Sequence, residues 1–141
     1  MTQKDNGYPP IADYALIGDC RTAALISRDG SIDWCCLPRF DSGAAFARLL
    51  DRERGGYCSV APRGNSWTSS RRYVDDTLVL ETTFEARSGN VTLYDFFSEA
   101  GAGERGPQLV RVLEATRGSV DMDIRIAPRF DYGEVRPWIR R

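Results

Sequence analysis

Three short turns that contain glycine, each flanked by two runs of β-forming residues, constrain the fold of this chain more than any other feature. The flanking runs are residues 22–27 and 31–37, 76–86 and 90–97, and 108–116 and 119–128. The turns between them contain Asp29-Gly30, Arg87-Ser88-Gly89 and Arg117-Gly118. Because glycine supplies the positive φ that tight hairpin turns require, the pattern predicts three antiparallel β-hairpins.

The last of these runs alternates between apolar and charged side chains. Apolar residues take one face and charged residues the other: Val120, Met122, Ile124 and Ile126 against Asp121, Asp123 and Arg125. This period of two predicts a strand with one buried face and one face in water. Two further strands are predicted at residues 55–62 and 66–74. Since hairpins follow one another without helical crossovers, we predict an all-β fold, an antiparallel β-sandwich or barrel.

One segment has the pattern of a helix rather than a strand. Between residues 43 and 53, Phe46, Leu49 and Leu50 share one stripe of a helical surface. Asp41 or Ser42, just before it, is a suitable N-cap. The sequence therefore predicts one short helix within the β-fold.

The composition excludes several classes of protein. The chain has 141 residues, of which 42% are hydrophobic and 28% charged, as in an ordinary globular domain. Its 19 basic and 20 acidic residues are spread without blocks, so we expect no nucleic-acid surface. No apolar run approaches the roughly 20 residues of a membrane span. Because the N-terminal MTQKDNGYPP lacks the apolar core of a signal peptide, we expect a cytoplasmic protein.

The potential metal ligands are few. The chain contains no histidine, and its four cysteines form no CxxC pair. Cys35 and Cys36 are adjacent in a predicted strand, so they point to opposite faces and cannot easily share one metal ion. We expect Cys20, Cys35, Cys36 and Cys58 to be buried or half-buried structural thiols. No metal and no cofactor is implied.

The tetrapeptide PRFD occurs twice, at residues 38–41 and 128–131, each time after an apolar run. Proline ends a strand because it has no N–H to donate. Each copy then presents a guanidinium, an aromatic face and a carboxylate: Arg39, Phe40 and Asp41 in the first, and Arg129, Phe130 and Asp131 in the second. The residues that flank the two copies share little, which argues against an internal duplication.

Three roles are open for the two PRFD segments. Each arginine pairs with the aspartate of its own segment, or the segments dock against a neighbouring domain, or they contact a sugar. Trp34 and Tyr132 are candidates for the same surface, although a core or interface position is the alternative for Trp34. The candidate substrate-facing or domain-facing residues are Trp34, Arg39, Phe40, Asp41, Arg129, Phe130, Asp131 and Tyr132.

The residues after the second PRFD segment include Val135, Trp138 and Ile139, with no further turn or partner strand. Apolar side chains in such a position usually need something to cover them. We therefore expect the sandwich to be incomplete, with strands still to be added to its sheets.

Three long stretches resemble the trehalase-like N-terminal domain of bacterial glycoside hydrolase family 15 proteins, the group of glucoamylases and trehalases. They are residues 11–51 (IADYALIGDC and onward), 71–97 (RRYVDDTLVL and onward) and 109–133 (ending APRFDYG), followed by Arg136-Pro137-Trp138. The resemblance spans about residues 8–138, in the right order. It implies a flexible terminus at residues 1–7, followed by the front part of such a β-sandwich at residues 8–141.

The resemblance also implies that the catalytic machinery lies elsewhere. In family members a larger sandwich precedes an (α/α)6 barrel, whose loops carry a general-acid and a general-base glutamate. No position of this chain matches either glutamate, so we assign no catalytic residue. The implied partner is the absent barrel, and the chain alone is expected to be inactive.

Two pairs of carboxylates have a spacing that could suggest catalysis, Glu81 with Glu85 and Asp121 with Asp123. Inverting glycoside hydrolysis needs two carboxyl groups about 6.5–9.5 Å apart, one with a raised pKa. Asp121 and Asp123 alternate with apolar neighbours, which predicts a solvated outer face rather than a pocket.

Three functions remain open from the sequence. The first is the N-terminal portion of an inverting α-glucoside hydrolase, which supports the barrel and borders its active site and its α-glucoside substrate. The second is a carbohydrate-binding module, for which Tyr57, Trp67, Tyr94 and Tyr132 are candidate aromatic contacts. The third is an interaction domain that completes its sheets by forming a homo-oligomer through exposed edges.

Overall fold

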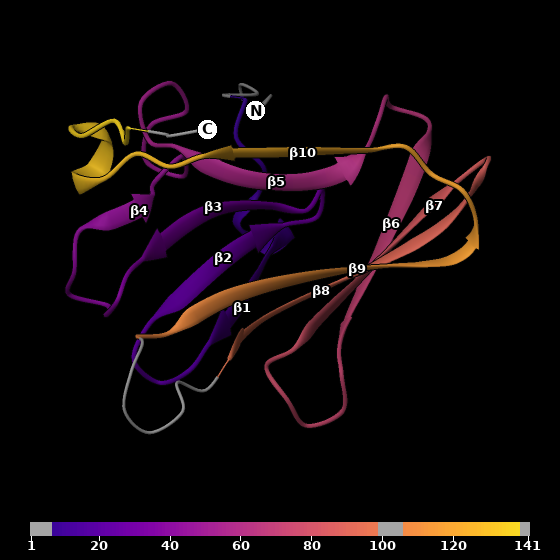
Figure 1. Cartoon of the computed structure of the whole chain (residues 1–141), viewed down its shortest axis with the longest axis horizontal. Helices are drawn as coiled ribbons and strands as arrows, with labels where there is room; N and C mark the ends of the chain where they lie inside the picture. The colour runs from indigo at the N-terminus through magenta and orange to yellow at the C-terminus, as the bar shows by residue number, and fades with distance from the viewer. Residues whose placement is uncertain (1–6, 99–105, 139–141) are drawn as a thin grey trace, which may run out of the picture.

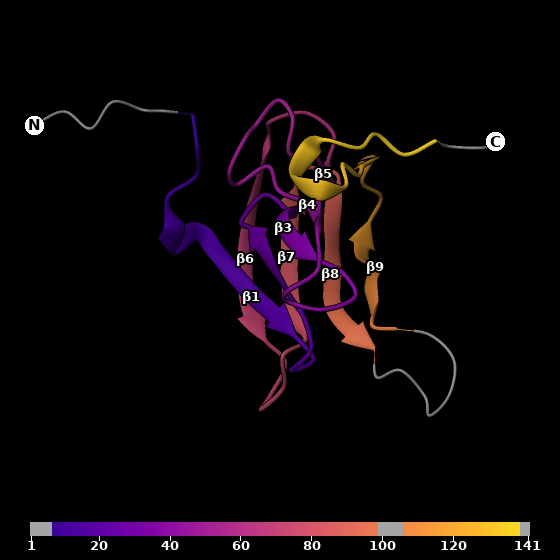
Figure 2. The same ribbon diagram turned by 90° about the vertical axis from the view of Figure 1, so that its left-hand side faces the viewer.

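The computed structural model describes residues 7–98 and 106–138, which form two antiparallel β-sheets packed face to face. In Figure 2 the strands of the smaller sheet run behind those of the larger one. This arrangement confirms the predicted all-β sandwich. The expected flexible terminus lies outside the described residues, except for Gly7.

The larger sheet has the strand order β1-β2-β3-β5-β10, with the short β4 added to β3 (Figure 1). Its strands are β1 (Tyr14–Gly18), β2 (Ala23–Ser27), β3 (Ser31–Cys36), β4 (Ala44–Phe46), β5 (Tyr57–Pro62) and β10 (Met122–Ala127). Gly30, in the turn between β2 and β3, has φ +76°, and its N–H donates to the carbonyl of Ser27 at 3.0 Å. The first predicted hairpin is therefore confirmed.

The smaller sheet has the order β6-β7-β8-β9. Its strands are β6 (Trp67–Tyr73), β7 (Leu80–Ala86), β8 (Gly89–Ser98) and β9 (Gln108–Gly118). The β7–β8 pair is the second predicted hairpin, with Ala86 opposite Gly89. Two 3-10 turns complete the secondary structure of the described residues, η1 (Ile11–Asp13) and η2 (Asp131–Gly133).

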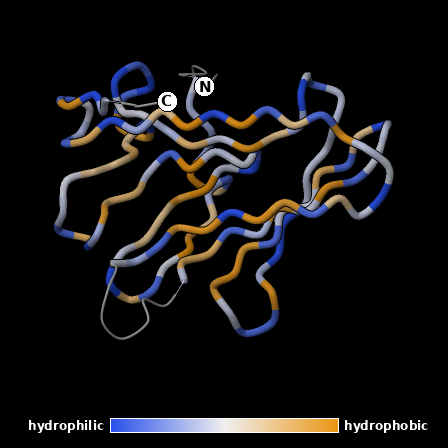
Figure 3. The backbone as a smooth tube through the Cα atoms, in the orientation of Figure 1, coloured by the Kyte–Doolittle hydropathy of each residue, from blue (hydrophilic) through white to orange (hydrophobic). Residues whose placement is uncertain are grey.

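The core lies between the two sheets. Figure 3 shows hydrophobic residues concentrated along the strands, with hydrophilic residues at many of the turns. Ile17, Ile26 and Ile32 of the larger sheet and Leu80 and Phe84 of the smaller sheet are fully or almost fully buried. Burial of this apolar surface, at about 25 cal/mol per Å², is the main force that holds the sheets together.

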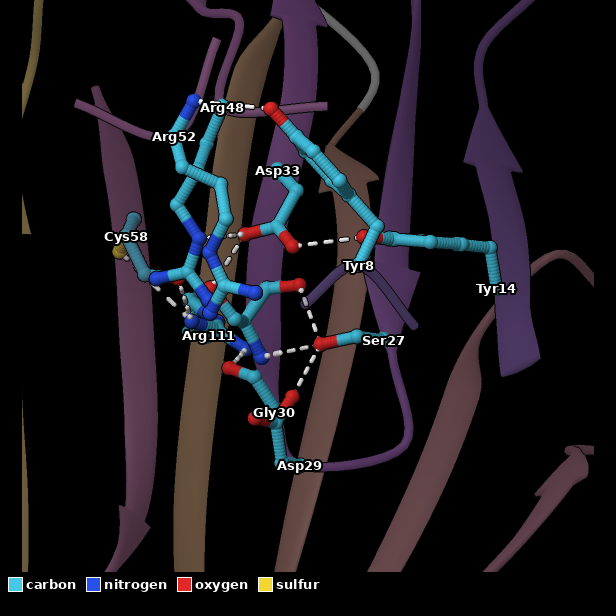
Figure 4. A network of polar contacts seen from close by, with 11 residues as sticks. Tyr8, Tyr14, Ser27, Asp29, Gly30, Asp33, Arg48, Arg52, Cys58 and Arg111 are labelled. Carbon is cyan, nitrogen blue, oxygen red and sulfur yellow. Dashed lines mark hydrogen bonds and ion pairs between the residues drawn. The ribbon is translucent and has the colours of Figure 1, made fainter. Parts of the chain in front are cut away.

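A buried ion pair also joins the sheets. Arg111 on β9 contacts Asp95 on β8 through two hydrogen bonds of 2.6 and 3.1 Å. The same guanidinium crosses to the larger sheet and donates to the carbonyls of Gly30 and Cys58 at 2.8 and 2.9 Å (Figure 4). Burial raises the pKa of Asp95, and the hydrogen bond and charge of Arg111 oppose that rise.

The predicted helix at residues 43–53 is wrong. Ala44–Phe46 form β4, in which Phe46 lies opposite Cys35 of β3, and the chain then turns. The N–H groups of Ala47 and Arg48 donate to the carbonyls of Gly55 and Gly56, at 2.6 and 3.1 Å. Pairing with β3 and with the returning chain thus replaces the hydrogen bonds that a helix would have made, since tertiary contacts override weak helix propensity.

The third predicted hairpin is also wrong. β9 pairs with β8 in the smaller sheet, whereas β10 pairs with β5 in the larger sheet. The turn that contains Gly118, whose φ is +63°, therefore carries the chain from one sheet to the other. A turn motif predicts a reversal of direction, but the sheet that accepts the next strand depends on which partner edge is free.

β9 and β10 are the edge strands on the same side of the sandwich, and an apolar groove lies between them. We call it the edge groove; its volume is about 610 Å³. Its lining residues are Leu37, Phe46, Cys58, Val60, Leu93, Leu109, Arg111, Leu113, Ile124 and Ile126. The prediction that the apolar face of residues 120–126 is buried is wrong at two positions, because Ile124 and Ile126 are 58% and 63% exposed here.

The cysteines largely behave as predicted. Cys35, Cys36 and Cys58 are buried, and burial raises the pKa of Cys35 to about 12. Cys20 differs, because it is exposed in a turn with φ +67°. Among residues 7–98 and 106–138, no helix is long and apolar enough to cross a membrane.

Candidate functional site

The segment at the start of β4 brings part of the predicted site together. The N–H of Arg129, in the second PRFD segment, donates to the carbonyl of Ala45 at 3.0 Å. The Asp131 carboxylate lies so close to Gly43 that a side chain there would collide with it. The second PRFD segment therefore runs along β4, which follows the first PRFD segment in the chain.

The first PRFD segment faces a different hollow. Arg39 pairs with Asp41, Nε to Oδ1 at 3.0 Å, as the local interpretation of the motif predicts. Both side chains are largely exposed, and Phe40 is 61% exposed. The segment lines a hollow of about 560 Å³ together with Cys20 and Arg21. As predicted for a strand exit, β3 ends at Cys36, before Pro38.

The second PRFD segment does not make the predicted local ion pair. Nη1 of Arg129 donates instead to the carbonyl of Pro128 at 2.8 Å. Asp131 and Tyr132 have φ values of 49° and 57°, in the left-handed region that non-glycine residues rarely adopt. Such backbone strain costs about 1–3 kcal/mol per residue and concentrates at sites that bind something. The strain shapes the loop that presents Phe130 and Tyr132.

Trp34 and Tyr132 meet at this surface. Their ring centroids are 6.0 Å apart and the rings are tilted by 41°. Trp34 also packs against Cys36, Ala44 and Ala47, so it serves as a half-buried wall of a small apolar cluster. Burial raises the pKa of the Cys36 thiol, and a hydrogen bond with Tyr132 lowers it. The structure thus gathers Trp34, Asp131 and Tyr132 around β4.

A buried carboxylate that the sequence analysis missed lies on the outer face of the larger sheet. Asp33 is 1% exposed and accepts hydrogen bonds from Tyr14 Oη at 2.8 Å and Ser31 Oγ at 2.6 Å. Arg48 Nε lies 3.3 Å from it. Figure 4 shows Tyr14 and Arg48 converging on Asp33 from opposite sides. Burial, and then the bond to Asp33, raises the pKa of Tyr14.

One signal in the sequence could have found this group. Asp33 interrupts the run SIDWCC, in which its neighbours Ile32 and Trp34 are apolar. A charged residue within a run that is buried on both faces needs a partner, because an unpaired buried charge is costly.

The carboxylate pairs considered from the sequence lie on the outer faces of the sheets. Glu81 forms two hydrogen bonds with Arg72, at 2.8 and 2.7 Å, and Glu85 is exposed. Asp121 is exposed, and Asp123 pairs with Arg63 at 3.2 Å. Within the described part of the chain, no group of three or more cysteine, aspartate or glutamate side chains is arranged to hold a metal ion.

Comparison with known proteins identifies the family. The family model described as "Trehalase-like, N-terminal" matches residues 4–141. The trehalase of Mycolicibacterium smegmatis is 34% identical over 146 residues, which cover 92% of this chain and 22% of that protein. The trehalase of Thermoplasma volcanium is 35% identical over 139 residues, which cover 96% of this chain and 22% of that protein.

A third relative gives the same proportions. The trehalase of Mycobacterium tuberculosis is 34% identical over 143 residues, which cover 90% of this chain and 21% of that protein. The chain therefore spans about a fifth of the length of these curated relatives. No solved structure matches the chain. With a family model that covers residues 4–141 and three trehalases similar over nine-tenths of its length or more, the chain belongs to the family of trehalase-like N-terminal domains.

Proposed function

We propose that this chain is the non-catalytic N-terminal β-sandwich portion of an inverting α-glucoside hydrolase of glycoside hydrolase family 15, active in the cytoplasm. The observation that carries the proposal is the coverage: the match takes in nine-tenths or more of this chain but about a fifth of each trehalase. The other four-fifths of such a protein would hold the catalytic barrel and its two glutamates. Trehalose or a maltooligosaccharide would be the substrate.

In this proposal the second PRFD segment is the surface that supports the barrel and borders its active site. Phe130, Tyr132 and Val135 are 44%, 51% and 47% exposed, and Trp138 is 85% exposed. Aromatic and apolar side chains grouped on a strained loop are typical of an interface. The first PRFD segment, with its exposed ion pair, contributes less, because an exposed pair adds about 0–1 kcal/mol.

We expect the purified chain to release no glucose from trehalose or maltose above a protein-free blank. Hydrolysis by single displacement needs an acid and a base about 6.5–9.5 Å apart across a bound sugar, and the barrel would supply both. A coupled glucose assay measures this directly. Turnover that co-purifies with the chain would contradict the proposal. A reading frame that continues past the codon for Arg141 into a long segment with helical periodicity would support it.

We propose a second candidate function, completion of the sheets by a second copy of this chain, because the edge groove favours it. Leu113, Ile124 and Ile126 are 37%, 58% and 63% exposed along that groove. Two unpaired edge strands with an apolar surface between them promote edge-to-edge association.

In this case light scattering after gel filtration should show a dimer that dissociates on dilution. Replacing Ile124 and Ile126 together by lysine should give a monomer, because the charges would have to be buried without partners. Val112→Lys is the matched control: Val112 is 46% exposed on the neighbouring edge strand but does not line the groove. A wild-type chain that stays monomeric at high concentration would contradict this candidate function.

A further inference from the structure

A second hollow lies on the outer face of the larger sheet, at the end where β5 passes into β6. Its volume is about 360 Å³, within the range of about 300–1,000 Å³ typical of small-molecule sites. We call it the outer hollow. The residues that give it its chemistry are Arg48, Tyr57, Ser59, Asn65, Trp67 and Arg125, with Asp29 and Asp123 also in its lining.

The alternation of two neighbouring strands separates this hollow from the edge groove. On β5, Tyr57 and Ser59 line the outer hollow, whereas Cys58 and Val60 line the edge groove. On β10, Arg125 faces the outer hollow, opposite Ser59 in the pairing of the two strands. Because successive side chains of a strand point to opposite faces, the two hollows lie on opposite sides of one sheet.

Two of the walls are held in place by contacts behind them. The Arg48 guanidinium lies over the ring of Tyr57, 4.4 Å from its centroid, and its Nε is 3.3 Å from buried Asp33. The Trp67 indole donates its N–H to the Gly64 carbonyl at 2.9 Å, and its ring meets that of Phe84 edge to face at 5.2 Å. Fixed walls lower the cost of binding, since fewer side chains must be ordered.

The chemistry of the lining suits a neutral ligand rich in hydroxyl groups. Two arginines and two aspartates give a formal charge of zero, which disfavours a phosphate or another strong anion. Planar guanidinium, carboxylate and amide groups each offer two hydrogen-bonding positions, which match the neighbouring hydroxyls of a sugar ring. Within residues 7–98 and 106–138, no hydrogen bond engages the side chains of Tyr57, Ser59 or Asn65, so they remain available.

We propose that the outer hollow binds a neutral saccharide of one or two sugar units, with Tyr57 and Trp67 as aromatic walls and Asn65 and Arg125 as the outermost polar contacts. These are two of the four aromatic residues that the sequence offered for a binding module but could not place together. The site lies apart from both PRFD segments and needs no second domain to complete its walls.

Isothermal titration of the purified chain with trehalose, maltose and glucose tests this site. We expect saturable millimolar binding of at least one of the three. Asn65 and Arg125 are exposed, so Asn65→Ala and Arg125→Ala should fold normally, and circular dichroism checks this. Each should weaken binding about tenfold, because each removes a polar contact, that of Arg125 being charged. Arg117→Ala, at the exposed end of β9, is the matched control and should bind as the wild type does.

The absence of binding by all three sugars would overturn the proposal. So would binding that both hollow variants retain, since the sugar would then occupy another surface. Glucose release, measured in the same samples, bears on the proposed non-catalytic role and not on this site. Failure of the one proposal can therefore be told apart from failure of the other.

Discussion

Replacing Arg111 by methionine is expected to lower the free energy of unfolding by about 3–5 kcal/mol. Arg111 and Asp95 have side chains that are 10% and 0% exposed, so the change leaves a carboxylate buried without a partner. It also removes the hydrogen bonds that tie β9 to the carbonyls of Gly30 and Cys58 on the larger sheet. Urea unfolding followed by circular dichroism measures the loss.

The pH dependence of this variant has a definite sign. Burial raises the pKa of Asp95, and in the variant no guanidinium opposes that rise. A raised carboxyl pKa contributes stability below the unfolded value of about 3.9, and this contribution is lost as the pH rises through the folded value. The deficit relative to the wild type should therefore be largest near neutral pH and shrink as the pH falls.

Arg117→Met is the control for the Arg111 substitution. Arg117 lies on the same strand but is exposed, and its hydrogen bond to Asn90 is 3.3 Å long. Its replacement should change the stability by less than about 0.5 kcal/mol. If the two methionine variants were equally stable, the buried ion pair would not hold the sheets together.

Asp33→Ala is expected to lower the free energy of unfolding by about 2–4 kcal/mol, because it leaves three polar partners without their acceptor. Those partners are Tyr14, Ser31 and Arg48, at 2.8, 2.6 and 3.3 Å. The change should also weaken saccharide binding, since Arg48 would lose the contact that holds it in the wall of the outer hollow. Thermal unfolding and sugar titration measure the two effects separately.

The matched control is Asp41→Ala, which removes an aspartate that also pairs with an arginine. The Asp41 side chain is 73% exposed, so the loss should be at most about 1 kcal/mol. Similar losses for the two substitutions would mean that the Asp33 cluster is solvated in the folded protein. Unchanged sugar binding in Asp33→Ala, at a temperature where the variant is folded, would show that Arg48 needs no such support.

Much of the β-structure was predictable because its signals are local. Period-two alternation places Tyr57 and Ser59 on one face of β5 and Cys58 and Val60 on the other, and the pocket linings agree. The Asp29-Gly30 turn predicts the β2–β3 hairpin, since glycine accepts the φ of +76° found there. The helix predicted at residues 43–53 failed because its pattern is also local, whereas the competing strand pairing is with distant residues.

The candidate site was predictable only in part. Residue types directed attention to Trp34 and Tyr132, whose rings do meet, but also to Arg39 and Asp41, which pair with each other in the solvent. The outer hollow could not be predicted, because it combines side chains from four separate segments, with Arg48 and Arg125 far apart in the sequence. Only strand order brings them together.

The sequence by itself determined the β-class of the protein, two of its hairpins and the inward or outward direction of most strand residues, because backbone geometry couples each residue to its near neighbours. Tertiary structure alone decided that β10 joins β5 rather than β9, that Asp95 and Arg111 form a pair across the core, and that Arg48 reaches Tyr57. These outcomes depend on which edges and cavities remain once the sheets have packed. That choice is made by the free energy of the whole fold and not by any single stretch of chain.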